Sequence, residues 1–474
     1  MILDLENPDT PDRFDADVCI LGTGAAGITL ARRLAGTGLD VVILEAGGMM
    51  FERESHEVYD GTSTGMNYAI DLSRLRYFGG STNHWSGWCG PLDAEDFEPR
   101  PWVPTPGWPI SKGELDPYYR DACAFLELGP YVFDRRVAEP PAPSYTPRGA
   151  AFFETFQRRQ CPNLRLGYVH RGAIEATDNV RVVIHANALP IEADGRVVRE
   201  VRMSTMAGRM ASVRAGAFVV ACGGMENTRL LLASRNLANS SGLVGLGFMD
   251  HVFSMFAGLV IPIAEFEERE RFRSRLGLPP LVSLKISFEA QREMGLLSCS
   301  VGADPNAVPE RQKNQGPPGA GTMYPIFVVG EQPALSHSRI GLDPAKKDRF
   351  GVPRIVVHRQ VDDLTQRTIR EAVLRYGAML TRMGIGRVFI PTTRTELEWP
   401  FWVWPAFHPS GTTRMSDDPK AGVVNRDGRT HDVENLYLAG SSVFPAIGHI
   451  NPTMTIVALA FRLADHLRDS IGKR

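Results

Sequence analysis

The sequence predicts an α/β fold that begins with a βαβ unit. Residues 17–21 (DVCIL) and 40–44 (DVVIL) are short apolar runs rich in β-branched residues, a pattern typical of buried strands. Between them lie a glycine-rich turn and residues 25–34, whose composition favours a helix. Strand, turn, helix and strand in this order indicate two parallel strands joined by a crossover helix.

The glycine-rich turn reads G-T-G-A-A-G and places Gly22, Gly24 and Gly27 around Ala25 and Ala26. Glycines at these three positions allow a tight turn, close approach of a pyrophosphate to the backbone, and close packing of the helix on the strand. The free N–H groups at the helix start then face the phosphates. These five residues are therefore predicted to bind a dinucleotide.

An acidic residue after the second apolar run supports this prediction. Glu45 lies 18 residues after Gly27, where a carboxylate accepts the hydroxyl groups of a ribose. An acid at this place argues against NADP, whose ribose carries an additional phosphate. It does not distinguish FAD from NAD.

The rest of the chain shows predicted strands, loops and helices without an internal repeat. Residues 99–109 are rich in proline and tryptophan, and are expected to form a loop that crosses to a second domain. Residues 280–322 carry many prolines and glycines and little periodicity, so a loop-rich region is expected there. Strands are expected within 179–203, 218–221 and 339–358, and an amphipathic helix over 364–383.

Composition excludes several classes of protein. The 474 residues carry a formal net charge of −2, so neither nucleic acid nor an anionic membrane is expected as a partner. Six scattered cysteines, without a C-x-x-C pair or a His/Cys metal spacing, predict reduced thiols and no metal site. The acidic N-terminal segment lacks the apolar core of a signal peptide, and no uncharged run reaches the length of a membrane span. A cytoplasmic location is the expectation.

Two polar residues near the C-terminal end each allow two interpretations. His408 lies in the segment FHPSGTTRM, between an aromatic residue and a proline, and is therefore expected on a loop. Asn451 precedes Pro452 and a long apolar run, as an N-cap residue does. On these residues alone, His408 is either a structural histidine or a proton acceptor. Asn451 either caps a helix or also points at a ligand.

Several motifs together resemble one family. They are the segment from Gly22 to Glu45, YFGGSTNHWSG at 77–87, ACGGMENTRLLL at 221–232, HPSGTTRM at 408–415, and ENLYLAGSSVFP followed by NPTMT. Their content and order resemble the glucose–methanol–choline (GMC) oxidoreductases, FAD enzymes that oxidise alcohols. The resemblance runs over about residues 14–468 and points to the pyranose oxidase and bacterial sugar dehydrogenase branch, in which the last motif carries Asn-Pro-Thr.

The resemblance implies catalytic roles for two residues. His408 matches the family's catalytic base, and Asn451 matches its hydrogen-bonding partner. Neutral imidazole suits this work, because removal of a hydride from a carbinol carbon requires another group to accept the hydroxyl proton near neutral pH. The helix that begins at Pro452 is expected to direct its N–H groups at the flavin, where reduction creates negative charge.

The same resemblance implies the residues that contact FAD. The Gly-Gly segment is expected to pass the flavin ring, and the strand near Ala188 to meet the adenine. Beyond the residues of the turn, the implied contacts are Glu45, Ala46, Gly79, Gly80, Ser81, Asn83, His84, Trp85, Ala188, Cys222, Gly223, Asn227, Gly440, Ser441, Asn451, Pro452 and Thr453. Cys222 is expected to be structural rather than reactive.

His84 follows Gly80 at the spacing of the histidine that pyranose oxidase bonds covalently to FAD. Two readings of His84 stay open. One is a covalent bond, which would raise the oxidising power of the flavin and retain the cofactor. The other is non-covalent stacking or hydrogen bonding.

The resemblance also implies a domain organisation. A Rossmann-like FAD-binding domain of the GMC and p-hydroxybenzoate hydroxylase type is expected over residues 12–98, 165–262 and 423–474. A substrate-binding domain built on an antiparallel sheet is expected over residues 99–164 and 263–422.

The implied reaction is oxidation of a CH–OH group of a sugar, glycoside, cyclitol or aminoglycoside to the carbonyl, with hydride transfer to flavin N5. Oxygen, a quinone or another redox carrier is the implied electron acceptor. One alternative keeps the fold without net alcohol oxidation, as a FAD-containing lyase or decarboxylase. A second alternative is a binding protein without activity, and the pair of His408 and Asn451 argues against it.

Overall fold

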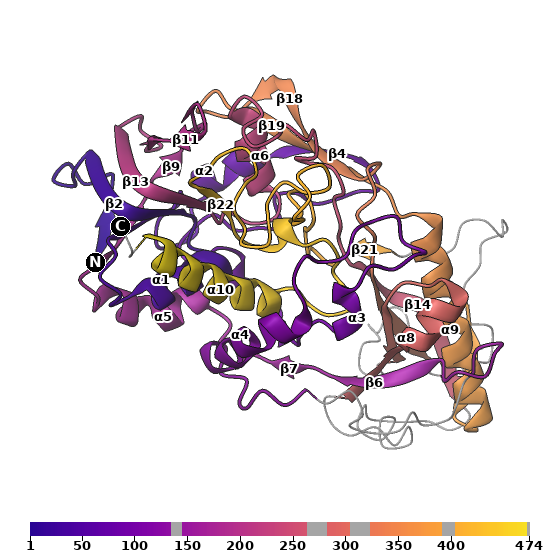
Figure 1. Cartoon of the computed structure of the whole chain (residues 1–474). Helices are drawn as coiled ribbons and strands as arrows, with labels where there is room; N and C mark the ends of the chain where they lie inside the picture. The colour runs from indigo at the N-terminus through magenta and orange to yellow at the C-terminus, as the bar shows by residue number, and fades with distance from the viewer. Residues whose placement is uncertain (134–144, 263–281, 304–322, 391–402, 472–474) are drawn as a thin grey trace.

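The computed structural model describes residues 1–133, 145–262, 282–303, 323–390 and 403–471. Two large sheets organise this part of the chain. One lies at the end of the molecule that holds the N-terminus, and the other lies at the opposite end beside helices α8 (Phe288–Met294) and α9 (Asp363–Arg382) (Figure 1). The structure therefore has the mixed α/β character that the sequence predicts.

The first sheet has eight strands in the order β1-β8-β3-β2-β13-β12-β9, and β22 also pairs with β13. Its central pairs are parallel, as the βαβ unit requires, because β2 lies between β3 and β13. Only the pairs that involve β12 are antiparallel among the described pairings of this sheet. The bounds are β1 Ile2–Asp4, β2 Arg13–Leu21, β3 Val41–Leu44, β8 Val180–Ile184, β9 Asn187–Ala188, β12 Glu200–Ser204, β13 Met210–Val220 and β22 Leu436–Leu438.

The last four residues of strand β2, Val18 to Leu21, are buried on both faces, which explains why this part of the strand is continuously apolar. Val18 and Ile20 face one core and Cys19 and Leu21 face the other. On the first face pack α1 (Ala25–Leu34), α5 (Leu166–Glu175) and α10 (Thr453–Ile471) (Figure 1). Helix α1 is joined to α10 by Arg33, whose guanidinium donates to both carboxylate oxygens of Asp465 at 2.9 and 2.8 Å.

The second sheet has seven strands and its described pairings are all antiparallel, as predicted for the second domain. The order is β20-β14-β17-β16-β15-β6, and β21 pairs with β14. Helix α9 covers one face, where its Ile369 and Val373 share a core with Val260 and Ile326 of the sheet. The bounds are β6 Phe153–Gln157, β14 Val252–Pro262, β15 Val282–Ile286, β16 Cys299–Ala303, β17 Tyr324–Gly330, β20 Gly386–Phe389 and β21 Trp404–Pro405.

The remaining elements belong to neither of the two large sheets. A three-stranded sheet, β18-β19-β4, lies along one side of the molecule (Figure 1). Its bounds and those of the smaller elements are β4 Gly61–Gly65, β18 Arg339–Lys347, β19 Pro353–Arg359, β5 Trp88–Cys89, β7 Arg159–Gln160, β10 Ala193–Asp194, β11 Val197–Val198, α2 Arg53–His56, α3 Ala94–Phe97, α4 Lys112–Phe125 and α6 Glu226–Ala233. None of the described helices combines the length and the apolar character that a membrane crossing requires.

Two expectations about the second domain need correction. Residues 282–303 lie within the region expected to be loops, yet they form β15, α8 and β16. The apolar and polar residues of β15 (VSLKI) alternate as in a strand, but the many prolines and glycines on both sides of it favoured the prediction of a loop. Residues 304–322 of the predicted loop region lie outside the described residues. The expected domain boundary after residue 262 assigns β14 to the FAD-binding domain, whereas β14 is a strand of the second sheet. The other domain boundaries remain predictions.

Candidate active site

A cavity of about 570 Å³ opens at the carboxyl ends of the parallel strands. Leu21, Leu44 and Ala221 line it at the ends of β2, β3 and β13. Ligands of open α/β sheets bind at this edge, because helix starts and loops converge there.

The start of helix α1 presents bare backbone to this cavity. No side chain caps the helix and its first turn has no acidic residue, so the N–H groups and the positive end of the helix dipole are open to an anion. Gly24 lines the cavity, and a Cβ built on it would meet nothing within 4 Å. Ala25 and Ala26 also line the cavity. This surface fits a diphosphate.

The other two glycines of the turn serve packing. Gly22 has a φ of 102°, and a Cβ there would lie 2.7 Å from the carbonyl oxygen of Ala221. Gly27 does not line the cavity; a Cβ there would lie 1.9 Å from the carbonyl oxygen of Gly22. The turn therefore depends on glycine at both positions because backbone lies directly against them.

Glu45 is buried at the cavity wall and is held by hydrogen bonds. Its Oε2 accepts from the N–H and the hydroxyl of Thr23 at 3.0 and 2.5 Å, and its Oε1 accepts from the N–H of Gly47 at 3.2 Å. Ala46 and Ala188 line the cavity near it. A fixed carboxylate at the end of β3 can accept further hydroxyl hydrogens, as the ribose prediction requires.

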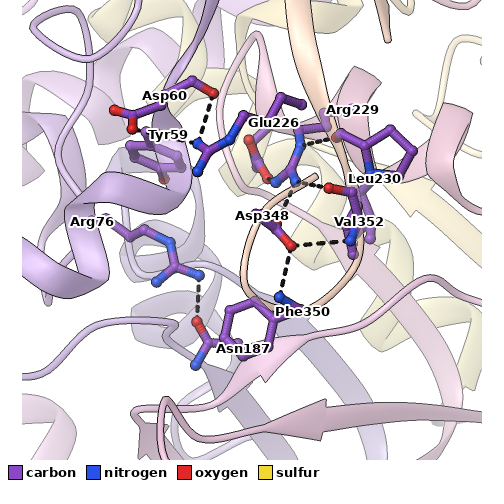
Figure 2. A network of polar contacts seen from close by, with 12 residues as sticks. Tyr59, Asp60, Arg76, Asn187, Glu226, Arg229, Leu230, Asp348, Phe350 and Val352 are labelled. Carbon is purple, nitrogen blue, oxygen red and sulfur yellow. Dashed lines mark hydrogen bonds and ion pairs between the residues drawn. The ribbon is translucent and has the colours of Figure 1, made fainter. Parts of the chain in front are cut away.

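Sequence reasoning missed two buried arginines on this wall, Arg74 and Arg76. Arg74 donates to Glu226 Oε2 at 2.8 Å, and Arg229 donates to Glu226 Oε1 at the same distance. Figure 2 shows Arg229 between Glu226 and Asp348, and Arg76 on Asn187. The available signal was R-L-R directly before the Gly-Gly segment, because two cations in an apolar context favour a nearby anion.

The Gly-Gly segment lies directly against the start of α1. Gly80 has a φ of 53°, and a Cβ there would lie 3.1 Å from the Cα of Gly24. Asn83 Nδ2 donates to the carbonyl oxygens of Phe78 and Gly80, both at 3.0 Å. Gly80 is therefore needed for the contact with the start of α1, whereas a Cβ on Gly79 would lie 2.9 Å from Asn83 Nδ2. Gly80, Ser81, His84 and Trp85 line the cavity.

The opposite wall comes from the ends of β13 and β22. Cys222, Gly223, Gly440 and Ser441 line it, and a Cβ built on either glycine would meet nothing within 4 Å. The N–H of Cys222 donates to Asn227 Oδ1 at 2.8 Å, and burial raises the pKa of the Cys222 thiol. A thiol with a raised pKa is a poor nucleophile, as predicted for a structural cysteine.

Four of the predicted cofactor contacts lie behind the lining and do not face the cavity. They are Gly27, Gly79, Asn83 and Asn227. Other protein groups bond to their atoms or fill the space beside them; for example, Asn227 Nδ2 donates to the carbonyl oxygen of Ala439 at 2.9 Å. These residues shape the loops that form the walls. The other predicted contacts, including Pro452 and Thr453, do line the cavity.

The structure brings His408 and Asn451 together on the cavity lining. Asn451 Nδ2 lies 3.3 Å from His408 Nε2, although the residues are 43 positions apart. Helix α10 begins at Thr453, and its first hydrogen bond runs from the N–H of Ile456 to the carbonyl oxygen of Pro452. The predicted helix start is therefore shifted by one residue, and the Asn451 amide faces the histidine.

A buried carboxylate sets the backbone at His408. Asp250 accepts from the N–H groups of His408 and Phe407 at 2.7 and 3.3 Å. Phe407 lies two residues after the end of β21 and has a φ of 59°. Burial raises the pKa of Asp250 to about 6, while these donors act in the opposite direction. Burial has the largest effect on His408 and holds its pKa well below the ordinary value.

One cluster of described residues has metal-ligating groups. Ligand atoms of Asp93, Asp96 and His449 lie within 4.8 Å of one another. The Lys285 ammonium pairs with Asp93 and lies 2.8 Å from Glu154 Oε1. A cationic side chain therefore already lies beside this cluster and balances part of its negative charge.

Comparison with known proteins identifies the family. Residues 17–242 match the model of FAD dependent oxidoreductases, and residues 334–460 match a model of GMC oxidoreductases. The chain belongs to the GMC oxidoreductases. Its cofactor is FAD, which agrees with the bare helix start and the fixed carboxylate described above.

This GMC oxidoreductase is similar over almost its whole length to named dehydrogenases. It is 24% identical to 2-methyl-1,2-propanediol dehydrogenase of Mycolicibacterium austroafricanum, over 97% of this chain and 96% of that protein. It is also 24% identical to the fructose dehydrogenase large subunit of Gluconobacter japonicus, over 97% and 99%. The fold resembles that of pyridoxine 4-oxidase from Mesorbium loti, with a TM-score of 0.64 at 18% identity, over 95% of this chain and 98% of that one.

Proposed function

We propose that this enzyme oxidises a CH–OH group of a sugar, glycoside, cyclitol or aminoglycoside to the carbonyl. FAD, when bound, supplies the hydride acceptor at N5. The observation that carries the proposal is the position of His408 Nε2, 3.3 Å from Asn451 Nδ2 on the lining of the cavity that holds the dinucleotide-binding residues. A proton acceptor and a hydrogen-bond donor thus share one point of the wall.

His408 accepts the hydroxyl proton at Nε2 as the carbinol carbon loses its hydride. Its lowered pKa keeps the imidazole neutral near pH 7, so the accepting lone pair is present before substrate binds. Asn451 Nδ2 donates to the substrate oxygen and orients the hydroxyl toward His408. Asp250 holds the backbone of His408 in this position.

Two observations support this substrate class: the names of the similar proteins and the polar groups that line the cavity. The two relatives described above are named for a diol and for a sugar. Both are small molecules rich in hydroxyl groups, which suits a cavity whose chemical end has a donor and an acceptor side by side.

The test is anaerobic reduction of the FAD-loaded protein by a panel of polyols. We expect at least one polyol to remove the visible absorbance of oxidised flavin in wild type and in a His431→Gln control. His431 is a half-buried histidine bonded to the carbonyl oxygen of Ser416 and does not line the cavity. His408→Gln should slow the reduction by about 10³-fold. Retained flavin that no polyol reduces would contradict the proposal and favour a lyase or decarboxylase.

The acceptor, the cofactor linkage and the location need separate measurements. Reoxidation rates with oxygen and with a quinone distinguish the proposed acceptors. Acid precipitation decides the role of His84, since covalently bound flavin stays in the pellet and free flavin enters the supernatant. We propose a reducing compartment, the cytoplasm, because none of the six cysteines is in a disulfide. Fractionation of the native cells would test this location.

A further inference from the structure

His251 contacts His408 through the ring nitrogen that faces away from Asn451. His251 Nδ1 lies 2.9 Å from His408 Nδ1, and His251 Nε2 lies 3.0 Å from the carbonyl oxygen of Gly448. The two rings meet edge to face, at 87° with centroids 5.0 Å apart. His251 is fully buried, so bulk water does not compete for either of its nitrogens.

These contacts determine where the hydrogens lie. A carbonyl oxygen only accepts, so His251 Nε2 carries the hydrogen in the bond to Gly448. Burial lowers the pKa of His251 to about 4, so the ring is neutral above that pH and its Nδ1 has a lone pair. That lone pair requires a hydrogen on His408 Nδ1. Neutral His408 then has its own lone pair at Nε2, on the cavity side.

We propose that His251 is a positioning residue that holds His408 in the Nδ1–H tautomer, so that Nε2 is free to accept the substrate proton. The catalytic consequence rests on the proposed function, whereas the tautomer does not. A histidine without such a partner populates both tautomers, and the Nε2–H form presents a hydrogen to the substrate where an acceptor is needed. His251 removes that unproductive form.

One loop affects the contacts at both ring nitrogens of His408. Gly448 provides the carbonyl that orients His251, and Asn451, three residues later, provides the amide at His408 Nε2. Gly448 has a φ of 55°, and a Cβ there would lie 2.5 Å from Asp96 Oδ2. The direction of the carbonyl therefore depends on glycine at this position. The loop that presents Asn451 also sets the tautomer of His408.

The arrangement serves both states of the base without rearrangement. When the substrate proton moves to His408 Nε2, the hydrogen on Nδ1 stays in its bond to His251. The bond then has a charged donor, and such bonds are shorter and stronger than neutral ones. While His251 is neutral, this stronger bond opposes the burial that lowers the pKa of His408, and burial has the larger effect.

The first test measures the tautomer directly in the FAD-loaded wild-type protein. Histidine labelled with ¹⁵N distinguishes protonated from bare ring nitrogens by NMR, and the His408 signals are those lost in His408→Gln. We expect a protonated Nδ1 and a bare Nε2 at pH 7.5. A protonated Nε2 with a bare Nδ1 would overturn the proposal, whatever the activity of any variant.

The second test removes the acceptor. His251→Leu leaves no hydrogen-bond acceptor, whereas His251→Asn keeps a side-chain carbonyl oxygen that can accept from His408 Nδ1. We expect the leucine variant to show both tautomers of His408 and a kcat about 10- to 100-fold lower, with KM within about threefold. The asparagine variant should regain activity in proportion to its fraction of Nδ1–H tautomer. His431→Leu, remote from the cavity, should leave the His408 signals unchanged.

The outcomes separate this inference from the proposed function. A leucine variant that keeps the wild-type tautomer, or loses kcat without a change of tautomer, would overturn the role of His251. Undiminished kcat in His408→Gln would instead remove the base role and leave the tautomer result standing. If the leucine variant does not fold, the wild-type spectrum still decides the tautomer.

Discussion

The two ends of the cavity are built by different means. The dinucleotide end is mostly backbone: Gly24, Gly223 and Gly440 line it, and open space lies over each of them. The chemical end is side chains, with His408 and Asn451 on the lining. We expect the backbone at the first end to bind the FAD diphosphate and the side chains at the second end to decide which reaction takes place. Substitutions at the two ends should therefore change different quantities, flavin content at one and turnover at the other.

The largest separation is expected at His408. His408→Gln removes the proposed proton acceptor while keeping a polar side chain, so kcat should fall by about 10³-fold with an unchanged ratio of flavin to protein. Steady-state kinetics and the visible spectrum of the same preparation measure both. If His408→Gln instead lost flavin but kept the wild-type turnover per bound flavin, His408 would contribute to cofactor binding and the two ends would not differ in function.

At the dinucleotide end, Gly24→Val tests the converse. Its side chain would fill space at the start of α1 that the diphosphate needs, so the Kd for FAD should rise about 100-fold, or about 2.7 kcal/mol. Fluorescence titration of the flavin-free protein measures this Kd. Gly172→Val on the exposed face of α5 is a matched control, since a Cβ there also meets nothing within 4 Å. Equal losses in both variants would indicate a general effect on folding.

Asn451→Ala should show whether the chemical end depends on more than His408. Loss of the amide donor removes one hydrogen bond to the substrate oxygen, which is worth about 1 to 2 kcal/mol and corresponds to a fall in kcat/KM of about 5- to 30-fold. The flavin content should not change. A loss of flavin in this variant would mean that Asn451 belongs to the cofactor site.

Glu45→Gln tests the weaker side-chain contribution at the dinucleotide end. An amide keeps one acceptor oxygen but loses the charge that strengthens bonds to Thr23 and to a ribose, so a rise in the FAD Kd of about tenfold is expected. The kcat of the FAD-saturated variant should equal that of wild type. A fall in kcat at saturating FAD would contradict this division of roles.

The last prediction concerns the acid limb of the pH profile of kcat/KM and has the smallest effect on activity at neutral pH. Burial lowers the pKa of His408, so its neutral form persists below pH 6.5 and kcat/KM should fall only at a lower pH. A profile of kcat/KM from pH 4 to pH 8 measures this directly. An acid limb with a midpoint at 6.5 or above would contradict a lowered pKa for the base.

The accuracy of the sequence predictions differs between the two ends for a physical reason. Residues 17–45 carry the dinucleotide signal in one contiguous stretch, because helix starts and tight turns are local structures. The roles of Gly79 and Asn83 were less accessible, since they depend on how the Gly-Gly segment folds back on itself. Arg74 and Arg76 were missed because burial of a cation is visible only in three dimensions.

The sequence by itself determined the βαβ unit, the glycine-rich turn with its acid, and the histidine and asparagine that share the C-terminal motifs. The tertiary structure alone decided that His251 meets His408 across 157 positions and that Gly448 orients it. The candidate base, His408, can be named from one position in the sequence. Its tautomer and its pKa depend on burial and on partners from distant segments, and those arise only when the chain is folded.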